Sequence, residues 1–314
     1  MAKYNFKISE LLFKLLELQN KELFAIVVYA FFTGLLYLLT PLAVEEIVNV
    51  IAFGVVSQPL VTLTILLIIG YLIAGGLRIT QQYASEIVQQ RLLVKYAFMF
   101  SRKLQFVPAS RFKERDLSYF FEIPLLQKSY GKLIVDGVNS VLQIFVGCIV
   151  LSFYHLYFFL LVVGLLIFTI FFLKWTGING LSSSISESES KYDLADWFRS
   201  IRKNELPSDK EAEEMTKVTD EFNLNYLQER NKHFKVTIRQ AIVLFVFIAL
   251  ANAVLLGVGG LLTLNGDITT GRLVAAEIIL GLVLGATDKL TGLISPLYDL
   301  MTALIKLKHI DGLA

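Results

Sequence analysis

The chain has 314 residues, of which 55% are hydrophobic, and it carries 29 Lys and Arg against 27 Asp and Glu, a formal net charge of +2. So small a positive excess gives no reason to expect a nucleic-acid partner, and the single cysteine, Cys148, excludes a disulfide within the chain. Several apolar runs of about twenty residues are long enough to cross roughly 30 Å of hydrocarbon. The sequence therefore predicts an all-α, polytopic membrane protein.

Residues 1–22 are predicted to form an amphipathic elbow helix that lies on the membrane surface before the first span. This segment has basic residues but no continuous apolar core and no small-residue cleavage site, so it is not typical of a cleaved signal peptide. Residues 23–311 are expected to form one membrane domain. The apolar positions of the elbow recur at helical spacing, at Ile8, Leu11, Leu12, Leu15 and Leu16.

The first span is expected from Leu23 to Phe53, interrupted at Pro41, and a second helix from Leu60 to Val107. The second helix stops being apolar near Gly76 but meets no proline until Pro108. At 1.5 Å per residue it would be roughly 70 Å long, more than twice the bilayer core. About half of this helix must therefore stand in water.

The chain is then expected to turn over Arg111 to Phe121 and to return as a helix from about Pro124 through the apolar run that ends at Phe153. A fourth span follows from Tyr157 to about Trp175, and a polar helix continues to just before Pro207.

A second long helix is predicted to begin at Ser208, because Ser208 and Glu211 form a capping box. Its apolar positions keep helical spacing through a charged stretch before the fifth span, which ends near Leu264. The sixth span starts at about Gly271 and continues as an amphipathic helix to Asp311. Six spans with two tall hairpins on one side result.

Orientation follows from the basic residues. The three short turns, Gly54 to Pro59, Tyr154 to Tyr157 and Leu264 to Gly271, contain no Lys or Arg, whereas basic residues are frequent at the other ends of the helices. Both termini and both hairpins are therefore expected to be cytoplasmic.

This organisation resembles the transmembrane domain of type I exporter-class ABC transporters, over nearly the whole chain. Local sequence supports the resemblance, which is greatest to bacterial peptide and protein exporters and implies a multi-pass protein of the plasma membrane, the inner membrane in a bacterium. The segments that carry it are LTPLAVEEIVNVIAFG, YASEIVQQRL, SESKYDLADWF, DITTGRLVAAEIILG and LYDLMTALIKLKHID.

The resemblance implies that short coupling helices at the hairpin tips, around Ser118 to Leu126 and Asp196 to Asn204, dock on ATP-binding domains. Internal packing of the tips is the alternative for their aromatic residues. The coupling candidates are Tyr119, Phe120, Phe121, Glu122, Trp197, Phe198 and Arg199.

A full-length exporter of this class continues after the sixth helix into a nucleotide-binding domain, whereas three residues follow Asp311 here. No G-x-x-x-x-G-K-[ST] phosphate loop occurs in the sequence: Gly131-Lys132 is followed by Leu133 and lacks the upstream glycine. We therefore expect no enzymatic activity and no cofactor in this chain. ATP is expected on a nucleotide-binding domain supplied in trans, and a second transmembrane half is expected as a homo- or heterodimer partner.

Ionisable residues at membrane depth cost a few kcal/mol or more when unpaired, so they are expected to face a wet cavity or a partner. Counting in from the turns places Glu45 and Glu277 in the outer leaflet, and Arg78, Asp288 and Lys289 toward the inner boundary. Local ion pairs or snorkelling are the alternatives to a role facing substrate. The translocation-path candidates are Glu45, Glu46, Arg78, Glu277, Asp288 and Lys289.

Small residues recur one helical turn apart on the fifth and sixth spans, which favours close helix packing within the chain or a subunit contact. They are Ala249, Ala253, Gly257, Gly281 and Gly285. His155, His233 and His309 are widely separated, so a metal site is not expected. Basic residues of the second hairpin suit anionic lipid or simply a cytoplasmic surface; they are Lys191, Arg199, Arg202 and Lys203.

The favoured function is a membrane-spanning subunit of an ABC-type exporter that moves a peptide, protein or lipid-like substrate. Two other classes stay open: a non-transporting regulatory or scaffold partner of a complete exporter, and an ion-coupled secondary transporter that uses the membrane carboxylates. Helices without broken segments at the membrane midplane count against the ion-coupled class. The sequence does not identify the substrate.

Overall fold

The computed structural model describes residues 20–53, 58–106, 108, 114–176, 180–202 and 208–311. These residues are helical except at short breaks and turns, and no strand occurs among them. The all-α class predicted from the sequence is confirmed for this part of the chain. Residues 1–19 of the predicted elbow helix lie outside the described residues, and Asn20 begins α2.

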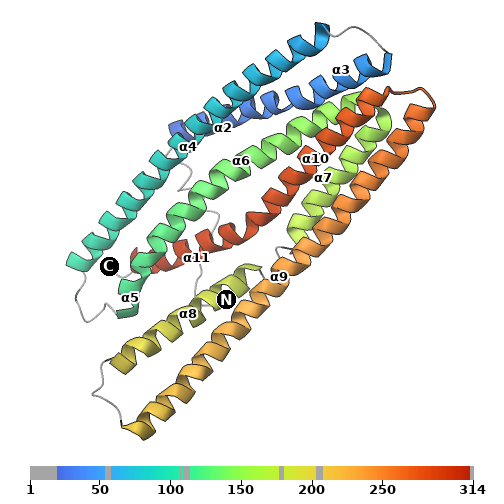
Figure 1. The fold of residues 1–314 in the computed structure, drawn as a ribbon. Coiled ribbons are helices and arrows are strands. Elements are labelled where there is room, and N and C mark those ends of the chain that lie inside the picture. Colours follow the sequence, from blue (N-terminus) through green and yellow to red (C-terminus); the bar gives the residue numbers. More distant parts are fainter. Residues whose placement is uncertain are drawn as a thin grey trace.

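The first hairpin begins with α2 (Asn20–Tyr37) and α3 (Leu39–Phe53), which follow one another along nearly the same line, and returns through α4 (Gln58–Phe106) (Figure 1). The break at Leu38 has a local cause. Pro41 has no N–H to donate to the carbonyl of residue 37, and its ring crowds that carbonyl. The helix resumes when Leu42 N donates to Leu38 O over 3.2 Å.

The 49 residues of α4 extend roughly 73 Å at 1.5 Å per residue. Its bounds agree with the predicted helix from Leu60 to Val107 to within two residues. Val107 itself lies outside the described residues.

Where the sequence predicted a plain turn over Arg111 to Phe121, the described residues are helical: α5 covers Glu114–Ser118 and the 3₁₀ turn η2 covers Tyr119–Phe121. Residues 111–113 are outside the described part. The long helix α6 (Glu122–Tyr154) then begins two residues before Pro124. A proline in the first turn of a helix is tolerated because the N–H it lacks would have no partner there.

After a one-residue break at His155 the chain continues as α7 (Leu156–Thr176), α8 (Gly180–Arg202) and α9 (Asp209–Leu264). No separate coupling helix interrupts α8, which continues to Arg202. The predicted capping box at the start of α9 is confirmed: the backbone N–H of Ser208 donates to Oε2 of Glu211 over 2.8 Å. With 56 residues, α9 extends roughly 84 Å.

The last two helices are α10 (Thr270–Gly292) and α11 (Ile294–Asp311), separated at Leu293. Pro296 explains that break as Pro41 explains the first, since it removes the bond to the carbonyl of residue 292. Gly266 has φ = 82° in the turn that precedes α10, a conformation that glycine adopts without steric cost.

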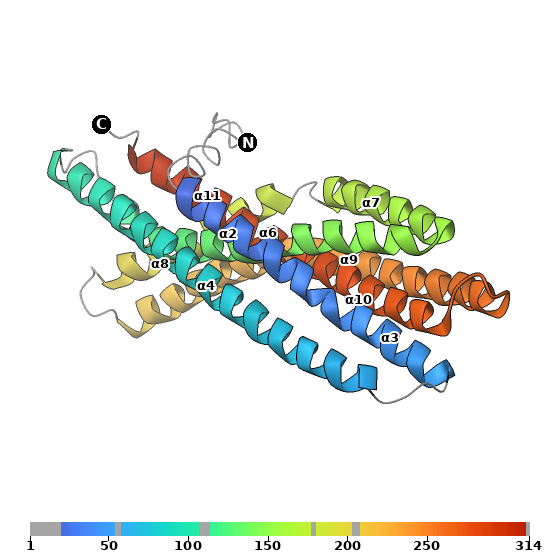
Figure 2. The same ribbon diagram turned by 90° about the horizontal axis from the view of Figure 1, so that it is seen from above.

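Seen in two directions, the helices run along one long axis (Figures 1 and 2). We call the turn end the end that holds the α3–α4, α6–α7 and α9–α10 connections, and the leg end the opposite one, where α4, α5, α11 and the α8–α9 hairpin end. The chain leaves α11 at the leg end. Helix α10 is central, packed against α3, α6 and α9.

Two groups of buried apolar side chains hold the bundle. The span core lies between α6, α7, α9 and α10, and the leg core joins α2, α4, α6 and α11. Fully buried members of the span core include Leu151, Leu255, Ile279 and Leu280, and those of the leg core include Ile26, Val88, Leu92, Ile123, Leu126 and Ile310.

Four stretches of the described residues are long and apolar enough to cross a membrane; they are Lys21–Ala52, Leu60–Phe106, Arg115–Tyr154 and Asp209–Leu264. Helix α7 adds a shorter apolar stretch, Leu156–Phe172. Large apolar side chains are exposed along these stretches, Leu72 and Phe153 among them. An apolar outer surface on helices of this length is the surface of an all-α membrane protein, whose solvent is lipid.

Candidate functional site

At the leg end a buried ion pair joins the last helix to the start of α6. Nζ of Lys306 lies 2.9 Å from Oε1 of Glu122, and the two residues are 5% and 1% exposed. The hydroxyl of Tyr192 on α8 donates to the same carboxylate oxygen over 2.7 Å, and Lys306 also donates to Ser188 on α8. Helices α6, α8 and α11 therefore meet at one buried polar point, the leg joint (Glu122, Ser188, Tyr192 and Lys306).

Aromatic rings surround the cation of the leg joint. Nζ of Lys306 lies 4.1 Å from the ring centroid of Tyr192 and 5.8 Å from that of Tyr119. Burial lowers the pKa of Lys306 to about 8, although the Glu122 carboxylate opposes that shift. Burial, and next the Glu122 carboxylate, raise the pKa of Tyr192, so its hydroxyl remains a donor. The ion-pair geometry makes Lys306 the partner of the Glu122 carboxylate in the leg joint.

Ion pairs also hold the two hairpins together near their tips. The guanidinium of Arg115 on α5 lies 2.7 Å from Oδ1 of Asp193 and 3.6 Å from Oδ2 of Asp196, both on α8. In return, Arg199 on α8 donates to the hydroxyl of Ser118 and lies 2.7 Å from Asp196. The structure thus brings together two segments that are about eighty residues apart in sequence.

Three of the predicted coupling residues pack inside the molecule. Tyr119 and Glu122 are buried. The indole N–H of Trp197 donates to Oγ1 of Thr219 over 2.8 Å, and its ring stacks on Phe222 with 5.8 Å between centroids. For these three, internal packing is what the structure supports.

The other aromatic coupling candidates face outward. Phe120, Phe121 and Phe198 are 39%, 73% and 51% exposed, and Leu117 beside them is 48% exposed. With Arg199, which is half-buried in its ion pair with Asp196, they form the tip surface (Leu117, Phe120, Phe121, Phe198 and Arg199). The tip surface lies at the leg end, far from the apolar spans, so its exposed rings are not explained by lipid.

The path candidates separate into two levels. Near the turn end, Tyr154 donates to Oε2 of Glu45 over 2.7 Å, and Nε of Arg272 lies 3.4 Å from Oε1. Glu45 therefore has local partners. Glu277, half-buried on α10, has a buried Oε2 with no hydrogen bond in the described part of the chain, whereas Glu46 is exposed.

One bilayer depth below the turns, Arg78 of α4 and Lys289 of α10 line one polar cavity of about 50 Å³, together with Asp136 of α6. The guanidinium of Arg78 donates to the hydroxyl of Tyr37 over 3.3 Å. Among the described residues none of these three charged groups is in an ion pair. Asp288 is exposed and is not among the residues that line the cavity.

Both stripes of small residues are open. Ala249, Ala253 and Gly257 are exposed on α9, and a Cβ placed at Gly281 or Gly285 of α10 would meet no atom within 4 Å. Packing within the chain, one of the two expected explanations, does not account for these positions. The same open face of α10 continues through Asp288 and Gly292, one or two helical turns farther on.

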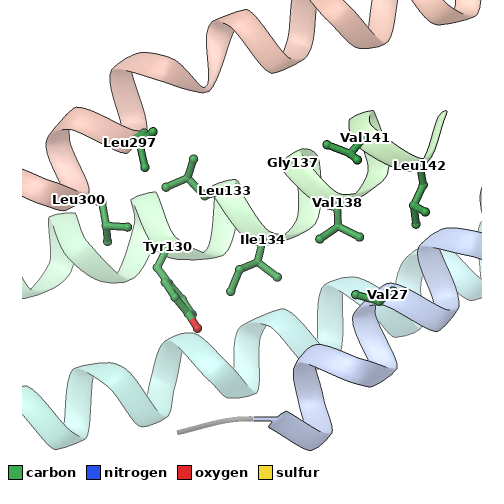
Figure 3. Close-up of a pocket in the computed structure, with 10 residues that line it drawn as sticks. All are labelled: Val27, Tyr130, Leu133, Ile134, Gly137, Val138, Val141, Leu142, Leu297 and Leu300. Atoms are coloured by element: carbon green, nitrogen blue, oxygen red, sulfur yellow. The ribbon is translucent and has the colours of Figure 1, made fainter. Parts of the chain in front are cut away.

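A larger groove of about 520 Å³ lies between α2, α6 and α11, and its lining is almost entirely apolar (Figure 3). Gly137, Val138 and Val141 of α6 line this groove, whereas Asp136 and Asn139 line the polar cavity, so the two cavities lie on different faces of the same helix. The groove offers hydrophobic contact and, beyond the hydroxyl of Tyr130, little to select a polar ligand.

No family model matches the chain, and no curated protein matches it.

Sequence reasoning missed two of the groups that matter most. Lys306 is buried, and the available signal was its place among apolar residues in ALIKLKHI. Asp136 was passed over inside the apolar run that follows Ile134. In both cases a charged residue inside an apolar helical pattern was the available sign.

The three histidines lie on different parts of the bundle and have different neighbours. His233 pairs with Glu187, His309 lies 3.8 Å from Asp116, and His155 stacks on Tyr157 at the turn end. No group of three or more His, Cys, Asp or Glu side chains suited to a metal occurs in the described ranges.

Proposed function

We propose that this chain is the membrane-spanning part of an ABC-type exporter, with six spans, that moves a peptide, protein or lipid-like substrate. The energy comes from ATP hydrolysed on a nucleotide-binding domain outside residues 1–314. The leg end is cytoplasmic, as are both termini, and the membrane is the plasma membrane, the inner membrane in a bacterium. This proposal rests on the resemblance of sequence segments and on the structure of the legs.

The observation that carries the proposal is the tip surface. Two hairpins rise tens of ångströms beyond the apolar spans, meet through Arg115–Asp193 and Arg199–Ser118, and expose Phe121 and Phe198 there. Exposed apolar side chains gathered on a polar leg mark a surface for a protein partner. A nucleotide-binding domain is the partner that fits a rigid pair of legs joined to membrane helices.

The proposed mechanism depends on the rigidity of the long helices α4 and α9. When ATP closes the partner domains, the tip surface moves, and α4 and α9, as unbroken helices, carry the motion into the spans. Such coupling requires a structural element that can adopt two conformations, and the ligand must favour one of them. The leg joint fixes α6, α8 and α11 to one another, so these three helices move as one body.

The open face of α10 supports a second transmembrane half. Gly281, Gly285 and Gly292 lie on the central helix α10, yet a Cβ added at any of them would meet no atom of the described residues within 4 Å. Small residues let helix backbones approach closely in a membrane. A second half that covers this face would enclose a path lined by Asp288, with Arg78 and Lys289 at its inner level.

One observation favours a second candidate, an ion-coupled transporter. In the part of the chain that the structure describes, the carboxylate of Glu277 has a buried oxygen without a hydrogen bond, and a carboxylate within a span is a candidate coupling group. Transport that follows an ion gradient, needs no ATP and is lost in Glu277→Gln would replace the first proposal with this one.

Site-specific cross-linking tests the exporter proposal. In a Cys148→Ser background, cysteine is placed at Phe121 or Phe198, and at Phe153, which is 84% exposed at the turn end, as the control. A bifunctional thiol and amine reagent is applied to native membranes, and captured proteins are identified by mass spectrometry.

We expect an ATP-binding protein or domain on the two tip cysteines and not on the control. Capture of no such protein at either tip position, in membranes where these ATPases are detected directly, would contradict the proposal. Equal capture at the tips and at Phe153→Cys would also contradict it, because the turn end lies on the opposite side of the membrane.

A further inference from the structure

The residues that line the polar cavity between α2, α4, α6 and α10 offer more hydrogen-bond donors and acceptors than they use in contacts with one another. The polar residues that line it include Arg78, Lys289, Asp136, Gln143 and Thr33. Two cations and one anion leave a net positive charge. Within the described part of the chain, the charged groups make no ion pair with one another.

Thr33 gives an independent sign of a missing ligand. A threonine inside a helix usually donates its hydroxyl to the carbonyl four residues earlier, as Thr80 and Thr169 do here over 2.9 and 2.8 Å. Thr33 is 4% exposed, and its Oγ1 has no hydrogen-bond partner among the described residues. A buried polar atom without a partner costs free energy that a ligand would recover.

Apart from the hydrogen bond of 3.3 Å from Arg78 to the hydroxyl of Tyr37, the helices around the cavity are held in place without using these groups. Gln81 of α4 and Asn139 of α6 exchange two hydrogen bonds of 3.1 Å, and the Gln81 amide also donates to the carbonyl of Ile26 on α2, over 3.3 Å. Three of the four cavity helices are therefore fixed to one another beside the unpaired cations. An arrangement fixed before binding costs little entropy when a ligand arrives.

The cavity lies at one level of the bundle. Thr33, Arg78, Asp136 and Lys289 each lie about 18 to 20 residues from the turn end of their helical segment, or roughly 27 to 30 Å at 1.5 Å per residue. That distance is the thickness of the hydrocarbon core. The site is thus at the boundary where lipid headgroups meet water on the leg side.

Size limits the ligand to a small group. A cavity needs a volume of about 10 to 15 Å³ to hold a single water. The polar cavity, at about 50 Å³, therefore accepts a few waters or one compact oxyanion. Guanidinium, ammonium, amide and hydroxyl donors are the groups that bind oxyanions. We propose that this cavity binds a single phosphate or carboxylate group, presented either by an anionic lipid headgroup or as a free anion.

Binding does not require transport or ATP, so the test uses the purified chain alone, in nanodiscs. In one arm, nanodiscs contain phosphatidylglycerol and phosphatidylcholine, and native mass spectrometry counts the lipids that stay bound. In the other arm, nanodiscs contain phosphatidylcholine alone, and inorganic phosphate is titrated while the melting temperature is followed. If phosphatidylglycerol stays bound and phosphate has no effect, the ligand is a lipid headgroup. If phosphate shifts the melting temperature in a saturable way, the ligand is a free anion.

Four substitutions test the proposal, because each should weaken or strengthen binding according to the group that it removes. Arg78→Gln and Lys289→Gln should each weaken binding at least about tenfold, because each removes a charge-assisted contact. Asp136→Asn should strengthen it several-fold, since it removes the anion that repels the ligand. Thr33→Val should weaken binding without lowering the melting temperature, because it deletes an unpartnered buried hydroxyl.

Lys132→Gln is the matched control, because Lys132 is exposed on α6 and does not line the cavity. The proposal is overturned if neither arm detects binding by the wild-type chain. It is also overturned if Arg78→Gln and Lys289→Gln bind as Lys132→Gln does, or if Asp136→Asn weakens binding. None of these results bears on the docking of a nucleotide-binding domain, which concerns the tip surface and is tested there by cross-linking.

Discussion

Glu122 and Lys306 are 184 positions apart in the sequence, yet Oε1 and Nζ lie 2.9 Å apart in a buried ion pair. The pair fixes the start of α6 to the middle of α11, and Tyr192 adds α8. A buried pair contributes little net stability compared with apolar residues of the same shape, but breaking it from one side is costly. The leg joint is therefore a fixed point of the legs and also a vulnerable one.

Lys306→Met should lower the free energy of unfolding by about 3–5 kcal/mol, because it leaves the Glu122 carboxylate buried without a cation. Titration with sodium dodecyl sulfate in mixed micelles measures this change. The double variant with Glu122→Gln should recover at least half of the loss, since no charge is then left uncompensated. A double variant as unstable as the sum of the two single variants would show that the two residues are not coupled.

The same lysine makes stability depend on pH. Burial lowers the pKa of Lys306 to about 8 in the folded chain, against 10.5 for an exposed lysine. Between these two values the unfolded chain binds more protons than the folded chain, so this group adds stability as the pH rises from about 8 to about 10.5 and loses it again as the pH falls through 8.

The expected gain across that window is at most about 3 kcal/mol. Lys306→Met removes the titrating group, so the difference between wild type and variant isolates it from all other lysines. Melting temperatures of both proteins at a series of pH values give this difference. A difference that stays constant from pH 8 to 10.5 would mean that the lysine is not desolvated.

Local signals predicted the fold well. Pro41 predicted the break in the first span, and the Ser208–Glu211 capping box predicted the start of α9. The absence of a proline before Pro108 predicted the length of α4. Each is a rule about neighbouring residues, which the sequence states directly. The helix Glu114–Ser118 was not predicted, because five residues carry too little periodicity to detect, whereas a short helix around Ser118 to Leu126 was expected from the resemblance.

The site was less accessible to sequence reasoning, because it depends on pairing between distant elements. The sequence predicted Arg78 and Lys289 as charges toward the inner boundary of the membrane, but nothing in it placed them in one cavity with Asp136. The pairing of Glu122 with Lys306 is equally invisible, since charge and spacing do not specify a partner 184 residues away.

Close contact between α3 and α10 depends on a single glycine. The backbone N–H of Gly271 donates to Oδ1 of Asn49 over 3.2 Å, and a Cβ at Gly271 would collide with the backbone oxygen of Glu45. Gly271→Ala should lower the free energy of unfolding by about 1–3 kcal/mol, because the backbone oxygen has no room to move. Detergent unfolding, as above, measures the loss.

Gly281→Ala is the control in the same helix, where an added Cβ meets no atom within 4 Å. It should leave stability unchanged or slightly raised, because alanine favours the helix over glycine. Equal losses for the two variants would show that glycine is needed for helix flexibility in α10 and not for contact with α3.

The proposed role of α9 as a rigid lever can be tested by a substitution that lies outside the membrane spans. Leu224 is 50% exposed in the part of α9 that stands beyond them, so replacing its side chain disturbs little packing. Leu224→Pro removes a helix hydrogen bond and crowds the preceding carbonyl, at a local cost of about 3 kcal/mol or more, and it kinks the helix. Transport should be lost while membrane insertion and binding of the nucleotide-binding domain remain.

Leu224→Ala keeps the helix straight and should transport as the wild type does, which separates the kink from the loss of the side chain. Transport is measured as ATP-dependent export from cells or inverted vesicles, and insertion by protease protection. If Leu224→Pro still exports substrate at the wild-type rate, α9 does not act as a rigid lever, and motion must reach the spans through α4 and the leg joint instead.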